Sequence, residues 1–93
     1  MELKDYRAAI DALDRELLAL FAQRLSLCSE IAVWKKARSL PALDEAREKE
    51  KLAAVKAHAP AGYEKETAAF FECVIALCRA SEERLLRQDG KEG

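Results

Sequence analysis

Residues 20–35 read LFAQRLSLCSEIAVWK, and they carry the pattern that decides the fold. Apolar residues recur here in steps of three and four, and the same stripe continues back towards the N-terminus. This apolar stripe comprises Tyr6, Ile10, Leu13, Leu17, Leu20, Leu27 and Ile31. Such spacing is typical of an amphipathic helix with one buried face. Two cations, Arg24 and Lys35, also fall on the stripe, where a helix that only packs would carry apolar residues.

The composition favours an all-helical protein of one domain. The chain has 93 residues, of which 51% are hydrophobic, and only 3 are Gly and 2 are Pro. Few residues therefore break helices, and nothing signals a β-hairpin. The formal net charge is −1, so the sequence lacks the basic surface of a nucleic-acid-binding protein. Uninterrupted apolar runs are too short for a bilayer and the first residues do not resemble a signal peptide, so we expect a cytoplasmic protein without membrane contact.

The cysteines, Cys28, Cys73 and Cys78, indicate neither a disulfide framework nor a metal site. Their number is odd, and no two of them have Cys-x-x-Cys spacing. The chain also has a single histidine, which argues against a His-based metal site. We therefore expect reduced thiols, in keeping with a cytosolic protein, and no bound metal.

The sequence predicts three helices, over residues 3–38, 45–58 and 64–87. The first contains neither Gly nor Pro and ends before Pro41, because the residue before a proline avoids helical geometry. Asp44 is suited to cap the second helix, and Gly62 lies in the break before the third. We expect one domain over residues 1–88, followed by a polar tail over 89–93.

The first helix is too long for a compact domain of this size. Its 36 residues span roughly 54 Å at about 1.5 Å per residue. A compact chain of this length has a radius of gyration of only about 12 Å. Further apolar residues, including Leu18, Phe21 and Leu25, lie off the stripe. We therefore expect this helix to pack against a second copy of the chain, in an intertwined homodimeric bundle of three-helix protomers.

The two cations on the stripe indicate a binding site. An unpaired buried charge costs several kcal/mol, whereas a whole domain is stable by only about 5–15 kcal/mol. Either cation alone is more simply explained by an ion pair or by a side chain that reaches solvent. Arg24 and Lys35, however, lie eleven residues or about three turns apart, so they share one face. Together they predict a cavity that receives an anion.

Four segments resemble the all-helical, type II class of chorismate mutases, of the bacterial monofunctional kind. They are residues 7–14, 17–24, 31–35 and 43–48. The shared pattern is Arg-x-x-Ile-Asp-x-Ile/Leu-Asp, an Arg after Leu-Leu-x-Leu, a Lys eleven residues later, and Asp-x-x-Arg-Glu at the start of the second helix. Residues 77–82 also resemble a family segment usually read as Ser-Arg-x-x-Gln. The resemblance covers residues 3–87.

The resemblance implies an isomerase that converts chorismate to prephenate, on the route to phenylalanine and tyrosine. This [3,3] rearrangement is intramolecular and requires no nucleophile, metal or cofactor. The enzyme must hold a flexible dicarboxylate in a compact chair and stabilise the charge that develops on the ether oxygen. Positioning and preorganised electrostatics supply the rate of such a reaction.

The resemblance also implies a role for each matching residue. The implied substrate-binding residues are Arg7, Arg24, Lys35, Asp44, Arg47, Glu48, Cys78 and Glu82, and the catalytic ones among them are Lys35, Glu82 and Arg24. Arg7 and Arg24 would each hold a carboxylate, for which the planar guanidinium is suited. Lys35 and Glu82 would contact the ether oxygen. About 25 Å of helix separates Arg7 from Arg24, so we expect Arg7 to come from the other protomer.

The start of the second helix would recognise the ring hydroxyl. Asp44 and Glu48 would orient it, with Glu48 accepting its proton and Arg47 in support. Cys78 stands where the family commonly has Ser, and a thiol is the weaker donor. Glu82 stands where the family has Gln. Either Glu82 donates to the ether oxygen when protonated, so that turnover rises at lower pH, or Lys35 neutralises Glu82 and the site is slower.

Two other functions remain open from the sequence. A lyase of the same fold that removes pyruvate from isochorismate makes similar pericyclic demands, but the complete Asp44-x-x-Arg47-Glu48 motif favours the mutase. A non-catalytic helical dimerisation or regulatory module would suit the departures at Cys78 and Glu82. The chain is also compatible with a free-standing enzyme or with one domain of a longer one, fused to a dehydratase, a dehydrogenase or an aldolase-type synthase.

Overall fold

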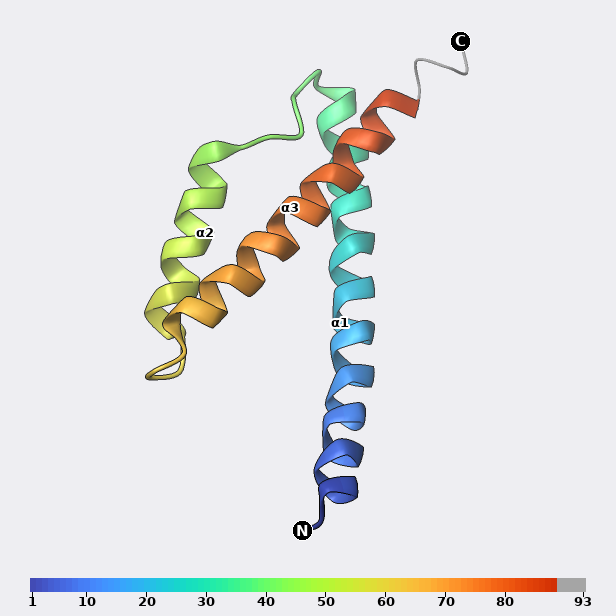
Figure 1. The fold of residues 1–93 in the computed structure, drawn as a ribbon. Coiled ribbons are helices and arrows are strands. Elements are labelled where there is room, and N and C mark those ends of the chain that lie inside the picture. Colours follow the sequence, from blue (N-terminus) through green and yellow to red (C-terminus); the bar gives the residue numbers. More distant parts are fainter. Residues whose placement is uncertain (89–93) are drawn as a thin grey trace.

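The computed structural model describes residues 1–88 and folds them into three helices (Figure 1). These are α1 (Leu3–Ala37), α2 (Glu45–His58) and α3 (Glu64–Gln88), and this part of the chain contains no strand. The predicted all-α fold is confirmed, and each predicted helix end agrees with the structure to within one residue. The tail predicted over 89–93 lies outside the described residues.

The helix α1 projects well beyond the other two. Figure 1 shows α3 crossing the C-terminal half of α1, while α2 lies on the far side of α3. The helix α3 packs against both α1 and α2. The molecule measures 58 × 28 × 14 Å and its radius of gyration is 16.8 Å, well above the value of about 12 Å for a compact chain of this length. Among residues 1–88, therefore, no element covers the N-terminal half of α1.

The turn after α1 fixes the loop that enters the candidate site. Ser39 has a φ of 55°, a left-handed conformation that usually falls to glycine at a helix end. The Leu40 N–H donates to the Lys35 carbonyl at 2.9 Å, and the Ser39 N–H donates to the Lys36 carbonyl at 3.1 Å. This pair of bonds is the Schellman arrangement that closes a helix. It turns the chain back, so that Ala42 lies beside the Lys35 side chain.

The start of α2 is capped as the sequence predicted. The Asp44 carboxylate accepts a hydrogen bond from the Arg47 N–H at 3.1 Å. This bond satisfies one of the four N–H groups that a helix start leaves without a partner. It also places Asp44, Arg47 and Glu48 within the first turn of one helix.

The core is small and lies between α3 and the C-terminal half of α1. Buried Cys28, Val74 and Cys78 form its centre, with Phe21 and Leu25 packed against them. The face of α1 that packs is therefore adjacent to the apolar stripe and not the stripe itself. Tyr6, Ile10, Leu13, Leu17 and Leu20 of the stripe are 49–60% exposed, because α3 does not reach the N-terminal half of α1. The described part of one chain does not provide the burial expected for the stripe.

The helix α1 is long and apolar enough, by length and composition alone, to cross a membrane. Its most apolar 18-residue window has a mean hydropathy of 1.4. Core helices of soluble proteins meet the same criterion, so this measure does not separate the two cases. The absence of membrane contact stays a prediction.

Candidate active site

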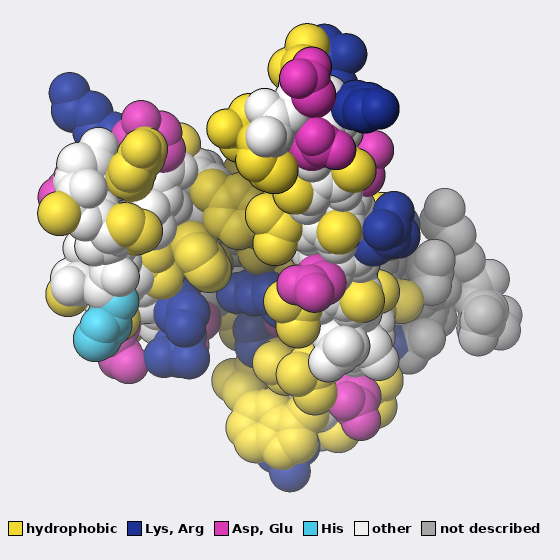
Figure 2. Space-filling model, turned by 90° about the horizontal axis from the view of Figure 1, so that it is seen from below, with side chains coloured by type: hydrophobic (Ala, Val, Ile, Leu, Met, Phe, Trp, Pro, Cys, Tyr) yellow, Lys and Arg dark blue, Asp and Glu magenta, His cyan; other side chains and the backbone are white. Residues whose placement is uncertain are grey.

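A cavity of about 430 Å³ lies between the three helices, at the C-terminal end of α1. Its walls are Arg24, Leu27, Cys28, Ile31 and Lys35 of α1, Ala42 and Asp44 of the following loop, Arg47, Glu48 and Lys51 of α2, and Ile75, Cys78, Arg79 and Glu82 of α3. A cavity of this size suits a small-molecule ligand. Figure 2 shows the molecule from below, with basic side chains in the hollow between its two lobes.

The cavity gathers seven of the eight residues that the resemblance implied. They are Arg24, Lys35, Asp44, Arg47, Glu48, Cys78 and Glu82. The eighth, Arg7, lies on the exposed N-terminal part of α1 and does not line the cavity. The role of each residue towards a substrate remains a prediction.

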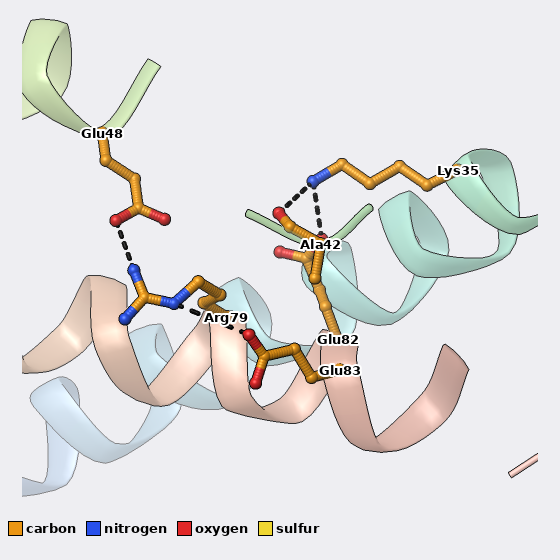
Figure 3. Close-up of polar contacts among 6 residues, drawn as sticks. All are labelled: Lys35, Ala42, Glu48, Arg79, Glu82 and Glu83. Carbon is orange, nitrogen blue, oxygen red and sulfur yellow. Dashed lines mark hydrogen bonds and ion pairs between the residues drawn. The ribbon is translucent and has the colours of Figure 1, made fainter. Parts of the chain in front are cut away.

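Lys35 and Glu82 form an ion pair inside the cavity (Figure 3). The Lys35 ammonium donates to Glu82 Oε1 at 3.0 Å and to the carbonyl oxygen of Ala42 at 2.7 Å. The side chains of Lys35 and Glu82 are only 15% and 10% exposed. Of the two alternatives for Glu82, the geometry matches the one in which Lys35 neutralises its charge. The ammonium keeps one further N–H, since a lysine has three.

A second ion pair joins α2 to α3. The Arg79 guanidinium donates to Glu48 Oε1, and its Nε lies 3.9 Å from Glu83 Oε1 (Figure 3). Sequence reasoning gave Arg79 no role. Its spacing in the sequence could have identified it, because residues 75, 78, 79 and 82 share one face of a helix and residues 78 and 82 were already predicted to line the site. Lys51, one turn after Glu48, was missed in the same way.

The charged residues that line the cavity are mostly basic. Arg24, Lys35, Arg47, Lys51 and Arg79 face only three acidic residues, Asp44, Glu48 and Glu82. The remaining walls include apolar side chains of Leu27, Ile31 and Ile75. The cavity therefore suits a ligand with an apolar body and two negative charges. Its basic groups come from one face of α1, one face of α3 and the N-terminal part of α2.

The thiol of Cys28 lines the cavity and is unsuited to nucleophilic chemistry. Its pKa is raised from 9.0 to about 11, and burial is the largest cause. A hydrogen bond with Cys78 and the charges of Cys78 and Glu82 contribute to this rise, whereas Arg24 opposes it. The thiol therefore stays protonated near neutral pH, and only the thiolate is nucleophilic. Within residues 1–88, no three His, Cys, Asp or Glu side chains are grouped to hold a metal ion.

Comparison with known proteins agrees with this geometry. Residues 6–83 match the family model described as chorismate mutase type II. The T-protein of Haemophilus influenzae is 50% identical over 46 residues, which are 50% of this chain and 12% of the T-protein. The matched segment therefore spans about one eighth of the length of that relative. No solved structure matches the chain significantly. The family model covers most of the chain and all three helices, so the protein belongs to the chorismate mutase type II family.

Proposed function

We propose that this protein is a chorismate mutase, which rearranges chorismate to prephenate in the synthesis of phenylalanine and tyrosine. The cavity carries the proposal, because it combines a basic excess with the Asp44-x-x-Arg47-Glu48 helix start and the Arg24 and Lys35 face of α1. Chorismate is a small dicarboxylate with an apolar ring, which matches both the charge and the apolar walls.

Arg24 and Lys35 supply the preorganised positive charge that the reaction needs. The rearrangement breaks a C–O ether bond and forms a C–C bond without transferring a proton. Arg24 would hold one carboxylate with its guanidinium. Lys35 would direct its remaining N–H at the ether oxygen, where negative charge grows as the bond breaks. Such fixed donors need no reorganisation during the reaction, which is the main source of electrostatic catalysis.

The start of α2 would orient the ring. Asp44 uses one carboxylate oxygen to cap α2, and its second oxygen is available to a ligand. Glu48 would accept a hydrogen bond from the ring hydroxyl, and Arg47 would support both acids. On the opposite wall, Cys78 and Glu82 would complete the contacts. Holding the substrate in its reactive chair removes much of the entropic part of the barrier.

The active unit would be a homodimer of 1–88 domains. The exposed part of the apolar stripe lies on a helix that projects from its own domain, and a second copy would cover it. Arg7 lies about 25 Å along α1 from Arg24, so it would reach a cavity only in the partner. Sedimentation should therefore give a dimer at micromolar concentration, and a monomer that remains fully active would contradict this arrangement.

The test of the function is loss of the chorismate ultraviolet absorbance with purified protein, with prephenate identified as the product. We expect turnover by the wild-type protein from acidic to neutral pH. A folded dimer that is inactive across this range would overturn the proposal. Isochorismate would then distinguish the lyase, which releases pyruvate, from a non-catalytic dimerisation module.

Burial of α1 in the dimer would also keep the protein away from membranes. The apolar residues of α1 would then face α3 and the second copy. We therefore propose a cytoplasmic enzyme, found in the supernatant of a lysate without detergent. Recovery only in the membrane fraction would contradict this location.

A further inference from the structure

Arg79 connects α3 to α2, the helix whose first turn carries Asp44, Arg47 and Glu48. It lies on α3 and donates to Glu48 Oε1 on α2 (Figure 3). Its side chain is 31% exposed and that of Glu48 is 23% exposed, so both are largely shielded from solvent. On its other side, Arg79 Nε lies 3.9 Å from Glu83 Oε1. The guanidinium is therefore held between two carboxylates.

The position of Glu48 depends on few other contacts. The helix α2 contains no buried residue, and it packs against α3 alone among the described helices. Apolar packing therefore does little to fix the first turn of α2 over the cavity. Glu48 is a long side chain with several rotatable bonds, and each bond left free would cost binding entropy when a ligand is held. The charge-assisted bond from Arg79 restricts this freedom before the ligand arrives.

The bond from Arg79 also gives the two carboxylate oxygens of Glu48 different roles. Glu48 Oε1 accepts from Arg79, which leaves Oε2 to accept from a ligand. An ionised carboxylate accepts hydrogen bonds and donates none, so Glu48 paired with Arg79 is suited to a hydroxyl donor. We propose that Arg79 is a positioning residue, which holds the Glu48 carboxylate so that it recognises the ring hydroxyl of the substrate. This inference rests on the proposed function, from which the role of Glu48 comes.

The test compares chorismate with an analogue that lacks the ring hydroxyl. In the wild-type enzyme, the ratio of kcat/KM for chorismate to that for the analogue measures recognition of the hydroxyl. Arg79→Ala should lower this ratio about 10-fold, the usual scale for losing a hydrogen bond with a charged partner. The loss should fall on chorismate, with the analogue changed little. Arg79→Lys should retain part of the ratio, because lysine keeps the charge but not the fork.

Two further variants separate positioning from general damage. Glu48→Gln should lower the ratio as well, and adding Arg79→Ala to it should cause little further loss, because both act through one contact. Glu83→Gln is the matched control, since it removes the other carboxylate beside Arg79 without changing the cavity wall, and it should leave the ratio unchanged. Circular dichroism and the urea midpoint check that each variant folds. If Arg79→Ala does not fold, Arg79→Lys is used for the test instead.

Each outcome decides the inference. Equal losses for both substrates in Arg79→Ala would overturn it and would indicate a contact with a carboxylate instead. An unchanged ratio in an active enzyme would also overturn it, while leaving the proposed function intact. A wild-type protein without activity towards chorismate would overturn the proposed function and this inference with it.

Discussion

Replacing Lys35 by Met should destabilise the protein far more than breaking an exposed ion pair of the same length. Lys35→Met removes the ammonium that lies 3.0 Å from Glu82 Oε1 while keeping a similar volume. It leaves a carboxylate that is only 10% exposed without its cation. The Arg47–Glu50 pair has the same 3.0 Å separation, but its side chains are 63% and 73% exposed.

The two environments give very different magnitudes. Two unit charges at this separation attract by about 1.4 kcal/mol in water and about 5.5 kcal/mol at the effective dielectric constant of about 20 that suits partly buried groups. Removing one partner of a buried pair typically costs about 3–5 kcal/mol, because the other charge stays desolvated. An exposed pair contributes only about 0–1 kcal/mol. We therefore expect a loss of about 3–5 kcal/mol for Lys35→Met and less than about 1 kcal/mol for Arg47→Met.

Urea unfolding followed by circular dichroism at pH 7 measures both losses. All variants must be compared at one protein concentration, because the proposed dimer would add to the apparent stability. The double variant Lys35→Met/Glu82→Met should recover most of the loss, since an apolar pair of similar volume replaces a buried ion pair at little cost. Equal losses in Lys35→Met and Arg47→Met would refute the reasoning. So would a double variant that is no more stable than Lys35→Met.

Four other predictions concern the site. Glu82→Gln frees the Lys35 ammonium from its counter-charge, so we expect faster turnover at neutral pH; a turnover rate no higher than that of the wild type would contradict this. Arg7→Ala and Arg24→Ala should each be inactive alone but regain activity when refolded together, and inactive mixed dimers would rule out a shared site. Cys28 should react with iodoacetamide much more slowly than exposed Cys73, as mass spectrometry would show. Because folding raises the pKa of Cys28 from 9.0 to about 11, its contribution to stability should be complete below about pH 9 and fall as the pH rises towards 11. If the urea midpoint of Cys28→Ala falls with pH as steeply as that of the wild type, Cys28 is not the source of the pH-dependent stability.

The helices could be predicted from the sequence because local signals decide where they begin and end. Residues 3–37 contain no Gly or Pro, and Pro41 follows the end of α1 closely. Asp44 forms the cap that its side chain suggested. The gathering of Arg24 and Lys35 at one cavity follows from helical periodicity, which places residues eleven apart on one face. These features need no knowledge of the tertiary structure.

Features that depend on how two helices meet could not be predicted in this way. Residues 79–84 contain two Arg and two Glu, a composition typical of a solvated helix face. Whether Arg79 meets Glu48 depends on the turn at Gly62, which has a φ of 88° and sets the approach of α2 to α3. The stripe on α1 predicted an apolar contact surface covered by a second copy of the chain, and that dimer stays a prediction. Within the single chain, α3 packs on the adjacent face.

If the proposed function holds, the Lys35–Glu82 ion pair makes stability and catalysis compete at Glu82. Without a ligand, the Lys35 ammonium in the cavity would be a desolvated charge, and Glu82 and the Ala42 carbonyl satisfy it. The same carboxylate weakens the positive field at the place where the ether oxygen would develop negative charge. A glutamine there would donate to that oxygen and leave the ammonium charge unopposed, but it would also remove the counter-charge that stabilises the empty site. Glu82 would thus stabilise the folded protein while it lowers the positive potential at the ether oxygen. Such a compromise between stability and activity is common at active sites. Glu82→Gln should accordingly be faster and less stable, and both changes follow from the one ion pair.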